Sequence, residues 1–84
     1  MNGMKYIVYD NGMYSAPVIF PSSEDHADFS RRLGIKREDI MSAGFVELGP
    51  DGLQAYGSSH SLGIRSDSER DTKLIKRMMG DDGG

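Results

Sequence analysis

The sequence predicts an α+β fold, in which a mainly antiparallel sheet of four or five strands carries two helices on one face, in the order ββαββα. Two observations lead to this prediction. Two runs rich in β-branched and aromatic residues are each followed by turn residues and a returning run, which is typical of β-hairpins. After each hairpin comes a segment with helix-cap residues, apolar residues at helical spacing and a terminal glycine.

The first hairpin is expected from residues 5–9 and 13–20. The Asp-Asn-Gly turn at 10–12 supplies residues that tolerate a positive φ, as a tight turn between strands requires. Pro17 lies within the returning run and has no backbone N–H to donate to a sheet ladder. The second strand is therefore expected at a sheet edge, or to be irregular near Pro17.

The first helix is expected to start in the serine and acidic residues at 22–25 and to end near Leu33. Serine side chains accept hydrogen bonds from the unpaired N–H groups of a first turn, and acidic residues there favour the positive end of the helix dipole. Phe29 and Leu33 are spaced i, i+4 and predict a buried stripe. Gly34 suits the position that follows the last turn.

A second hairpin is expected from residues 40–48 and 53–56, joined by a turn that contains proline and glycine. Residues 57–63 are small and polar, and indicate a loop or an irregular short strand. An extra short strand around 62–65 is an alternative that the pattern leaves open. The order of elements would then contain a fifth strand before the second helix.

The second helix is expected to begin at a capping box, in which Ser66 caps the N3 amide and Glu69 reaches back to the cap. Its apolar face is formed by Leu74, Ile75 and Met78, and Gly80 ends it. The charges run from acidic at the start to basic at the end, which complements the helix dipole.

The length of 84 residues predicts a single domain, 1–84, with an ordered core at about 4–79 and a flexible tail at 80–84. A chain this short buries a small core, so oligomerisation would stabilise it. The residues expected in the core are the strongest apolar residues of the strands and helix faces: Ile7, Val8, Phe29, Leu33, Phe45, Val46, Leu74, Ile75 and Met78.

The composition favours a cytoplasmic protein. The chain has no cysteine, which removes disulfides and thiolate metal sites and is typical of a reducing compartment. The N-terminus lacks a signal-peptide pattern, and no apolar run is long enough for a membrane span, so no membrane partner is expected. A formal net charge of −3 is too weak to indicate a class of partner.

No set of residues predicts catalysis, a cofactor or a metal site. The only serine and histidine cluster is Ser59-His60-Ser61, in which neighbouring side chains of an extended chain point to opposite sides, so a structural or solvated loop is preferred over a hydrolytic site. His26 is interpreted as a packed or surface residue, because one helical turn supplies too few metal ligands. We therefore expect a protein that is not an enzyme and binds no cofactor.

The segment before the second helix is the predicted recognition surface. It can present many hydrogen-bond donors without disturbing the core, and a plain connector is the alternative. Replacing Ser59, His60 and Arg65 together with Ala is expected to leave the melting temperature nearly unchanged. The side chains of this candidate surface are Ser58, Ser59, His60, Ser61 and Arg65.

A nucleic-acid-associated accessory protein is the alternative function. Aromatic and basic side chains on a sheet face can stack on and attract a single-stranded nucleic acid. Strand tyrosines more often pack against cross-strand neighbours, so this remains the second hypothesis. The residues that would form such a face are Tyr6, Tyr9, Tyr14, Tyr56, Lys5, Lys73, Lys76 and Arg77.

Four runs of the sequence resemble small phage-encoded or prophage-encoded proteins that have no assigned activity. The runs are residues 5–10 (KYIVYD), 16–20 (APVIF), 42–46 (SAGFV) and 56–63 (YGSSHSLG). The resemblance implies a viral or mobile-element origin, and it would fit a role in modulating the host from within the host cytoplasm. It carries no catalytic motif and implies no functional residue.

Together these observations favour a small non-enzymatic protein that binds a protein partner or itself. Residues 13–20 offer a hydrophobic edge that Pro17 protects only in part, and a small domain gains stability by covering such an edge. A homodimer is therefore expected as one form of the interaction.

Overall fold

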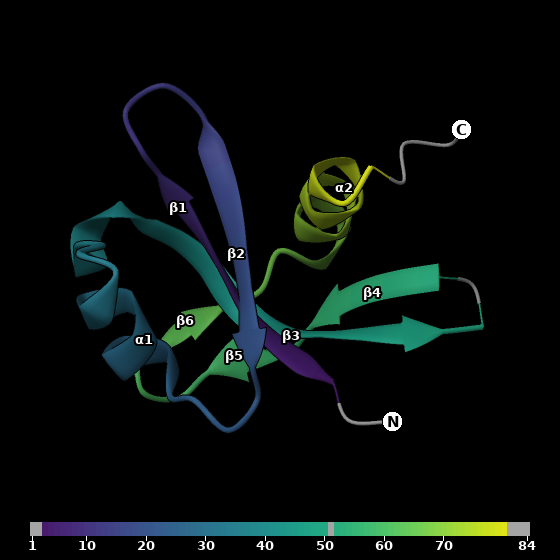
Figure 1. Ribbon diagram of the computed structural model, residues 1–84, viewed down its shortest axis with the longest axis horizontal. Helices are drawn as coiled ribbons and strands as arrows, with labels where there is room; N and C mark the ends of the chain where they lie inside the picture. The colour runs from purple at the N-terminus through teal and green to yellow at the C-terminus, as the bar shows by residue number, and fades with distance from the viewer. Residues whose placement is uncertain (1–2, 51, 81–84) are drawn as a thin grey trace.

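The computed structural model of the chain describes residues 3–50 and 52–80. It confirms the predicted α+β class, with a four-stranded antiparallel sheet in the order β2-β1-β3-β4 and two α-helices (Figure 1). A separate two-stranded β5-β6 hairpin follows β4. The elements are β1 (Met4–Asp10), β2 (Ser15–Pro21), α1 (His26–Arg32), the short 3-10 helix η1 (Arg37–Asp39), β3 (Ile40–Gly49), β4 (Gly52–Tyr56), β5 (Ser58–Ser59), β6 (Ile64–Arg65) and α2 (Ser68–Met78).

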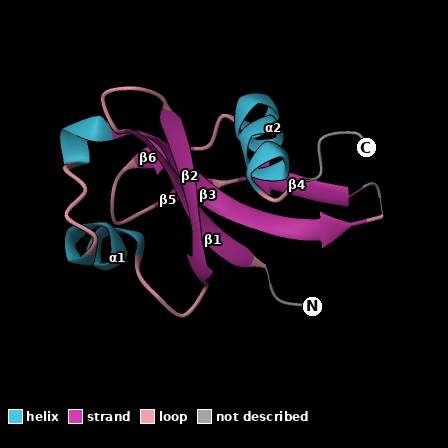
Figure 2. Cartoon of the chain, turned by 45° about the horizontal axis from the view of Figure 1, so that its top comes forward, coloured by secondary structure: helices cyan, strands magenta, loops and turns pink. Residues whose placement is uncertain are grey.

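The two helices lie on opposite faces of the sheet, which corrects the expectation that both cover one face (Figure 2). Successive side chains of β1 alternate between the faces. Tyr6 and Val8 pack in a cluster with Ile75 of α2, and Ile7 packs in a second cluster against which Phe29 of α1 lies. Because Tyr6, Ile7 and Val8 are all fully buried, this central strand requires cover on both sides.

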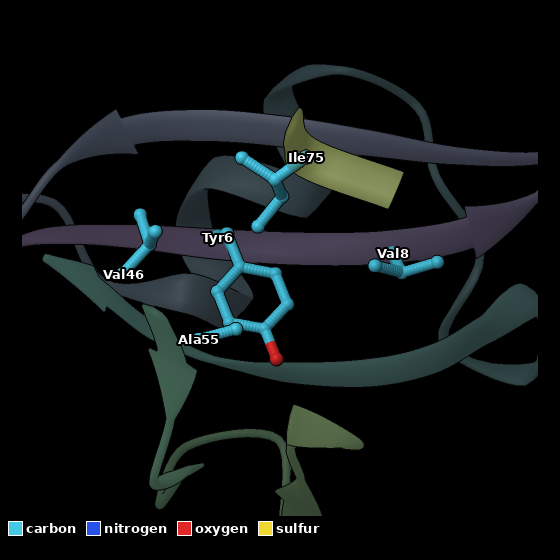
Figure 3. Packing of buried hydrophobic residues seen from close by; sticks show 5 residues of the cluster. All are labelled: Tyr6, Val8, Val46, Ala55 and Ile75. Carbon is cyan, nitrogen blue, oxygen red and sulfur yellow. The ribbon is translucent and has the colours of Figure 1, made fainter. Parts of the chain in front are cut away.

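The cluster on the α2 face joins β1, β3, β4 and α2 (Figure 3). Its buried members are Tyr6, Val8, Val46, Ala55 and Ile75. The cluster on the α1 face joins β1, β2, β3 and the β5-β6 hairpin, and its buried members are Ile7, Phe20, Ile40, Ala43 and Leu62. The hairpin therefore covers the same face as α1.

Strand β2 lies at a sheet edge, as Pro17 predicts. The N–H of Asn11 donates to the carbonyl of Tyr14 at 3.2 Å, which makes this a hydrogen-bonded pair next to the turn. Hydrogen-bonded and non-hydrogen-bonded pairs alternate along an antiparallel ladder, so Val8–Pro17 and Met4–Pro21 are non-hydrogen-bonded pairs. The nitrogen of each proline therefore faces away from the sheet, where no ladder bond is lost.

The opposite edge, β4, is covered by α2. The backbone N–H of Ala55 donates to Thr72 Oγ1 at 2.9 Å, and Ser68 Oγ donates to the carbonyl of Ala55. Side chains of the helix thus take the place of a neighbouring strand. Within the part of the chain that the structure describes, β2 is the uncovered edge of the large sheet.

Both helix caps differ from the predicted ones. Asp25, not a serine, caps α1 and accepts from the N–H groups of Ala27 at 3.1 Å and Asp28 at 3.2 Å. Asp67, one residue later than expected, caps α2 and accepts from the N–H of Arg70 at 3.3 Å. In each segment several cap-forming residues stand side by side, so local preference alone does not select one.

Four of the nine expected core residues are buried: Ile7, Val8, Val46 and Ile75. Phe29, Phe45 and Leu74 are partly buried. The expectation is wrong for Leu33 and Met78, which are 51% and 49% exposed. Leu33 is the C-cap of α1, where the helical spacing ends, and Met78 lies on the last turn of α2.

No helix in residues 3–50 or 52–80 is long and apolar enough to cross a membrane.

Candidate functional site

The predicted recognition segment is an ordered β-hairpin. Ser58 and Ser59 pair with Arg65 and Ile64, and Leu62 at its turn is buried in the core cluster on the α1 face. This arrangement confirms the alternative of a short strand near residue 64. The segment is therefore anchored at its centre as well as at its ends.

Ser59 supports this hairpin from the inside. It is only 2% exposed, and its Oγ accepts from the N–H of Leu62 at 3.2 Å. The carbonyl of Ser59 also accepts from the N–H of Gly63 at 2.9 Å. Its side chain is thus a part of the fold, and the triple alanine variant that includes Ser59 is now expected to lower the melting temperature.

The other predicted side chains differ in their exposure. Ser58 is partly buried, whereas His60, Ser61 and Arg65 are exposed. Ser61 Oγ accepts from the N–H of Ala27 at 3.3 Å, which ties the hairpin to the start of α1. His60 and Arg65 remain the side chains of this segment that are available to a partner, and their role in recognition stays a prediction.

A groove between β2 and α2 is a second candidate site, and no local pattern in the sequence indicates it. It has a volume of about 690 Å³. Figure 1 shows the start of β2 and helix α2 on the same side of the molecule. The groove is lined by Tyr14, Ser15, Ala16, Pro17, Leu74, Arg77 and Met78. The lining residues of β2 and those of α2 are about 60 positions apart in the chain, so only the folded structure brings the two groups together.

Large apolar side chains stand exposed around this groove. Met13 is 90% exposed and Tyr14 is 64% exposed, at the turn between β1 and β2. Met41, also exposed, has no partner in β1 because the pairing shifts between Val8 and Tyr9, which is a β-bulge. Ser15 Oγ lies 3.1 Å from Met41 Sδ, so the bulge places this methionine beside the lining of the groove.

Arg77 supplies the only charged group in the lining of the groove. It is exposed and forms no ion pair with any carboxylate in residues 3–50 or 52–80. The remaining polar groups of the lining are the hydroxyls of Tyr14 and Ser15. A surface with one cation, two hydroxyls and apolar walls is suited to binding.

A buried polar network holds the start of α2 against the sheet, whereas the groove is lined by its end. The hydroxyl of Tyr6 donates to Asp71 Oδ2, and the N–H of Asp67 donates to the same oxygen at 2.9 Å. Arg70 Nε donates to Asp71 Oδ1 at 3.2 Å, and Arg70 Nη2 donates to Ser42 Oγ at 3.0 Å. Burial raises the pKa of Tyr6 far above its usual range, and the Asp71 carboxylate raises it further, so this hydroxyl remains a donor. The network fixes the start of α2 on the sheet.

His26 has a structural position on the α1 face. It is 3% exposed, and its Nε2 lies 2.9 Å from the carbonyl oxygen of Gly44. The rings of Phe20 and Phe45 contact it edge-on, at 5.4 Å and 5.9 Å between centroids. This placement confirms the interpretation of His26 as a packed residue. Across residues 3–50 and 52–80, no three His, Asp or Glu side chains gather closely enough to hold a metal ion.

The tyrosines do not form one surface. Tyr6 is fully buried on the α2 face, whereas Tyr56 lies beside Phe45 on the face of α1. Tyr14 lines the groove. The predicted aromatic and basic face is therefore divided between the interior and two sides of the sheet.

Comparisons of the chain with protein-family models, curated proteins and solved structures found no match.

Proposed function

We propose that this protein is a non-enzymatic binding protein that acts by docking a protein partner in the groove between β2 and α2. The observation that carries the proposal is the apolar groove itself, whose lining includes the exposed side chains of Tyr14 and Met78. Contiguous apolar surface of this kind on a small protein marks an interaction site.

The lining of the groove indicates the chemistry of the partner. Leu74, Pro17 and Met78 favour apolar side chains. The guanidinium of Arg77, which forms no ion pair among the described residues, favours a carboxylate next to them. Met41 and Met78 have flexible, polarisable side chains that adapt to the shape of a partner. The partner therefore contributes a surface that combines apolar residues with an acidic one.

The separation of the tyrosines favours a protein partner over a nucleic acid. Stacking on single-stranded nucleic acid requires neighbouring aromatic rings on one basic face. Tyr6 is buried, and Tyr14 and Tyr56 lie on different sides of the molecule. The resemblance to small phage-encoded proteins supports a partner in the host cytoplasm, where such a protein would modulate the host.

The groove is tested by comparing two substitutions in a pulldown from a lysate of the source cell, with and without nuclease. Met78→Glu places a carboxylate in the groove, whereas Leu33→Glu makes the same change at a residue of matched exposure outside the groove lining. We expect specific captured proteins to be lost with Met78→Glu and kept with Leu33→Glu and after nuclease treatment. Capture that is equal for both variants would contradict the groove as the binding site, and capture that nuclease abolishes would favour the nucleic-acid alternative.

A further inference from the structure

The turn between β1 and β2 exposes an asparagine followed by a glycine, Asn11 and Gly12. In such a pair the backbone nitrogen of the glycine can attack the side-chain amide carbon of the asparagine, because both groups belong to one short stretch of chain and no Cβ obstructs their approach. Gly12 has a φ of 94°, a conformation that glycine adopts readily. The pair is therefore a candidate for chemical modification.

The attacking nitrogen lies against a carboxylate. The N–H of Gly12 donates to Asp10 Oδ1 at 2.8 Å. A general base must lie within hydrogen-bond reach of the proton that it removes, and Asp10 meets this condition for the proton of Gly12. Asp10 is exposed and forms no ion pair with a cation in residues 3–50 or 52–80, so its carboxylate is free to accept a proton.

The side-chain amide of Asn11 is polarised by two donors. Asn11 Oδ1 accepts from the backbone N–H groups of Met13 and Tyr14, each at 3.0 Å. Attack on the amide carbon places a negative charge on this oxygen, and backbone donors at such distances stabilise an oxyanion. The N–H of Asn11 also donates to the carbonyl of Tyr14 at 3.2 Å, which closes the turn. The turn thus holds a base at the nucleophile and two donors at the developing oxyanion.

We propose that Asn11 is a self-modification site, at which the folded turn converts the asparagine amide into an acid through a cyclic imide. The nitrogen of Gly12 forms a bond to Asn11 Cγ and gives its proton to the Asp10 carboxylate. The tetrahedral intermediate then expels the side-chain nitrogen as ammonia, which leaves with the proton that Asp10 returns. A water molecule opens the imide at either carbonyl and gives aspartate or isoaspartate, so the reaction consumes water, releases ammonia and needs no oxidant or reductant.

Both products change the surface of the turn. Each adds a negative charge beside Asp10, and isoaspartate also adds a methylene group to the main chain before Gly12, which displaces Met13 and Tyr14. Tyr14 lines the groove between β2 and α2, so the modification irreversibly changes one wall of that groove. The inference itself does not depend on what the groove binds, because the reacting groups belong to the turn alone.

Peptide mass spectrometry of the full-length protein, incubated at neutral pH, measures the conversion of Asn11. We expect this conversion to be about tenfold or more faster in the folded protein than in the same chain unfolded in urea, because only the folded turn holds the base and the oxyanion donors in place. Asn11→Asp has no amide to lose at this position and sets the baseline for released ammonia. Equal or slower conversion in the folded protein would overturn the inference, since the same hydrogen bonds would then restrain the reacting groups.

A matched pair of variants tests the role of Asp10. Asp10→Asn keeps an acceptor for the N–H of Gly12 but removes the base, so conversion of Asn11 is expected to slow by about tenfold or more. Asp39→Asn removes the same charge from the other carboxylate that lines the hollow beside this turn, and is expected to keep the wild-type rate. Thermal melting verifies that both variants fold. Equal rates of conversion in the two variants would refute Asp10 as the base.

Discussion

At the scale of residues, the most informative positions are polar side chains in the interior. His26 and Asp71 are almost completely buried, yet each has hydrogen-bond partners: Gly44 for His26, and Tyr6, Asp67 and Arg70 for Asp71. In the described residues no buried side-chain polar atom lacks a partner. Buried polar groups that are fully bonded impose one arrangement on the elements that carry them, because a displaced arrangement would leave them unbonded.

His26 is expected to make stability depend on pH. Burial lowers its pKa in the folded protein and Lys5 on β1 adds to this effect, while the Gly44 carbonyl and the Asp25 carboxylate oppose it. The unfolded chain therefore binds a proton more readily, so the free energy of unfolding is at its full value above the ordinary histidine pKa of about 6.5 and falls as the pH decreases below it.

Urea unfolding at several pH values between about 7.5 and 5.5 measures this dependence. His26→Gln, which keeps an N–H donor for Gly44 but does not titrate, is expected to reduce the slope of stability against pH. His60→Gln, at the exposed histidine, is the matched control and should keep the wild-type slope. Equal slopes for the two variants would show that His26 does not cause the dependence.

Tyr6→Phe is expected to destabilise the protein by about 1–3 kcal/mol, because it leaves the buried Asp71 carboxylate without one of its donors. Tyr56→Phe makes the same chemical change at a partly exposed ring and is expected to shift stability by less than about 0.5 kcal/mol. Chemical denaturation of the two variants gives both values. A neutral Tyr6→Phe would mean that the other donors suffice for Asp71.

At the scale of elements, the two edges of the large sheet are protected in different ways. Prolines remove outward donors from β2, whereas side chains of α2 bond to the outward groups of Ala55 in β4. A covered edge is fixed to the helix, and an uncovered edge leaves the neighbouring groove open. The candidate groove lies at the β2 edge, where its lining is mainly apolar.

Thr72→Val tests the cover of β4. It keeps the shape of the side chain but removes the acceptor for the N–H of Ala55, which is fully buried, so we expect a loss of about 1–3 kcal/mol and faster hydrogen exchange of the Ala55 amide. Thr72→Ser keeps the hydroxyl and is expected to retain the slow exchange. Fast exchange in the wild-type protein would contradict a covered edge.

At the scale of the whole molecule, one central strand supports two separate core clusters. β1 contributes Tyr6 and Val8 to one cluster and Ile7 to the other, so each helix packs on its own face of the sheet. Two small clusters leave more apolar surface at the periphery than one large core does. The exposed side chains of Met13, Tyr14, Met78 and Met79 are a part of this surface.

The tail expected at residues 80–84 lies mostly outside the described residues, which end at Gly80. Gly80 itself follows α2 with a φ of 79°, which suits the predicted glycine after a helix. Leu33, expected in the core, shows the limit of spacing rules. Its N–H still donates to the carbonyl of Phe29 one turn earlier, yet its side chain is 51% exposed and belongs to neither core cluster. Helical spacing gives the direction of a side chain but not whether another element lies there to cover it.

The sequence by itself determined the class of the fold and the order of its main elements. Hairpin turns, helix caps and the edge position of Pro17 are local signals, since each depends on a few neighbouring residues and on the backbone conformations that these residues allow. These signals predicted two hairpins, two helices and an edge strand, and the structure contains all of them.

Only the tertiary structure decided which face each helix covers and where a binding groove is formed. The run of Tyr6, Ile7 and Val8 is apolar on both faces of its strand, so its sequence is compatible with cover on either side or on both. The groove joins Tyr14 and Pro17 to Leu74 and Met78, which meet because α2 packs across the sheet. Contacts between residues so far apart depend on the packing of all elements together, and no local pattern records them.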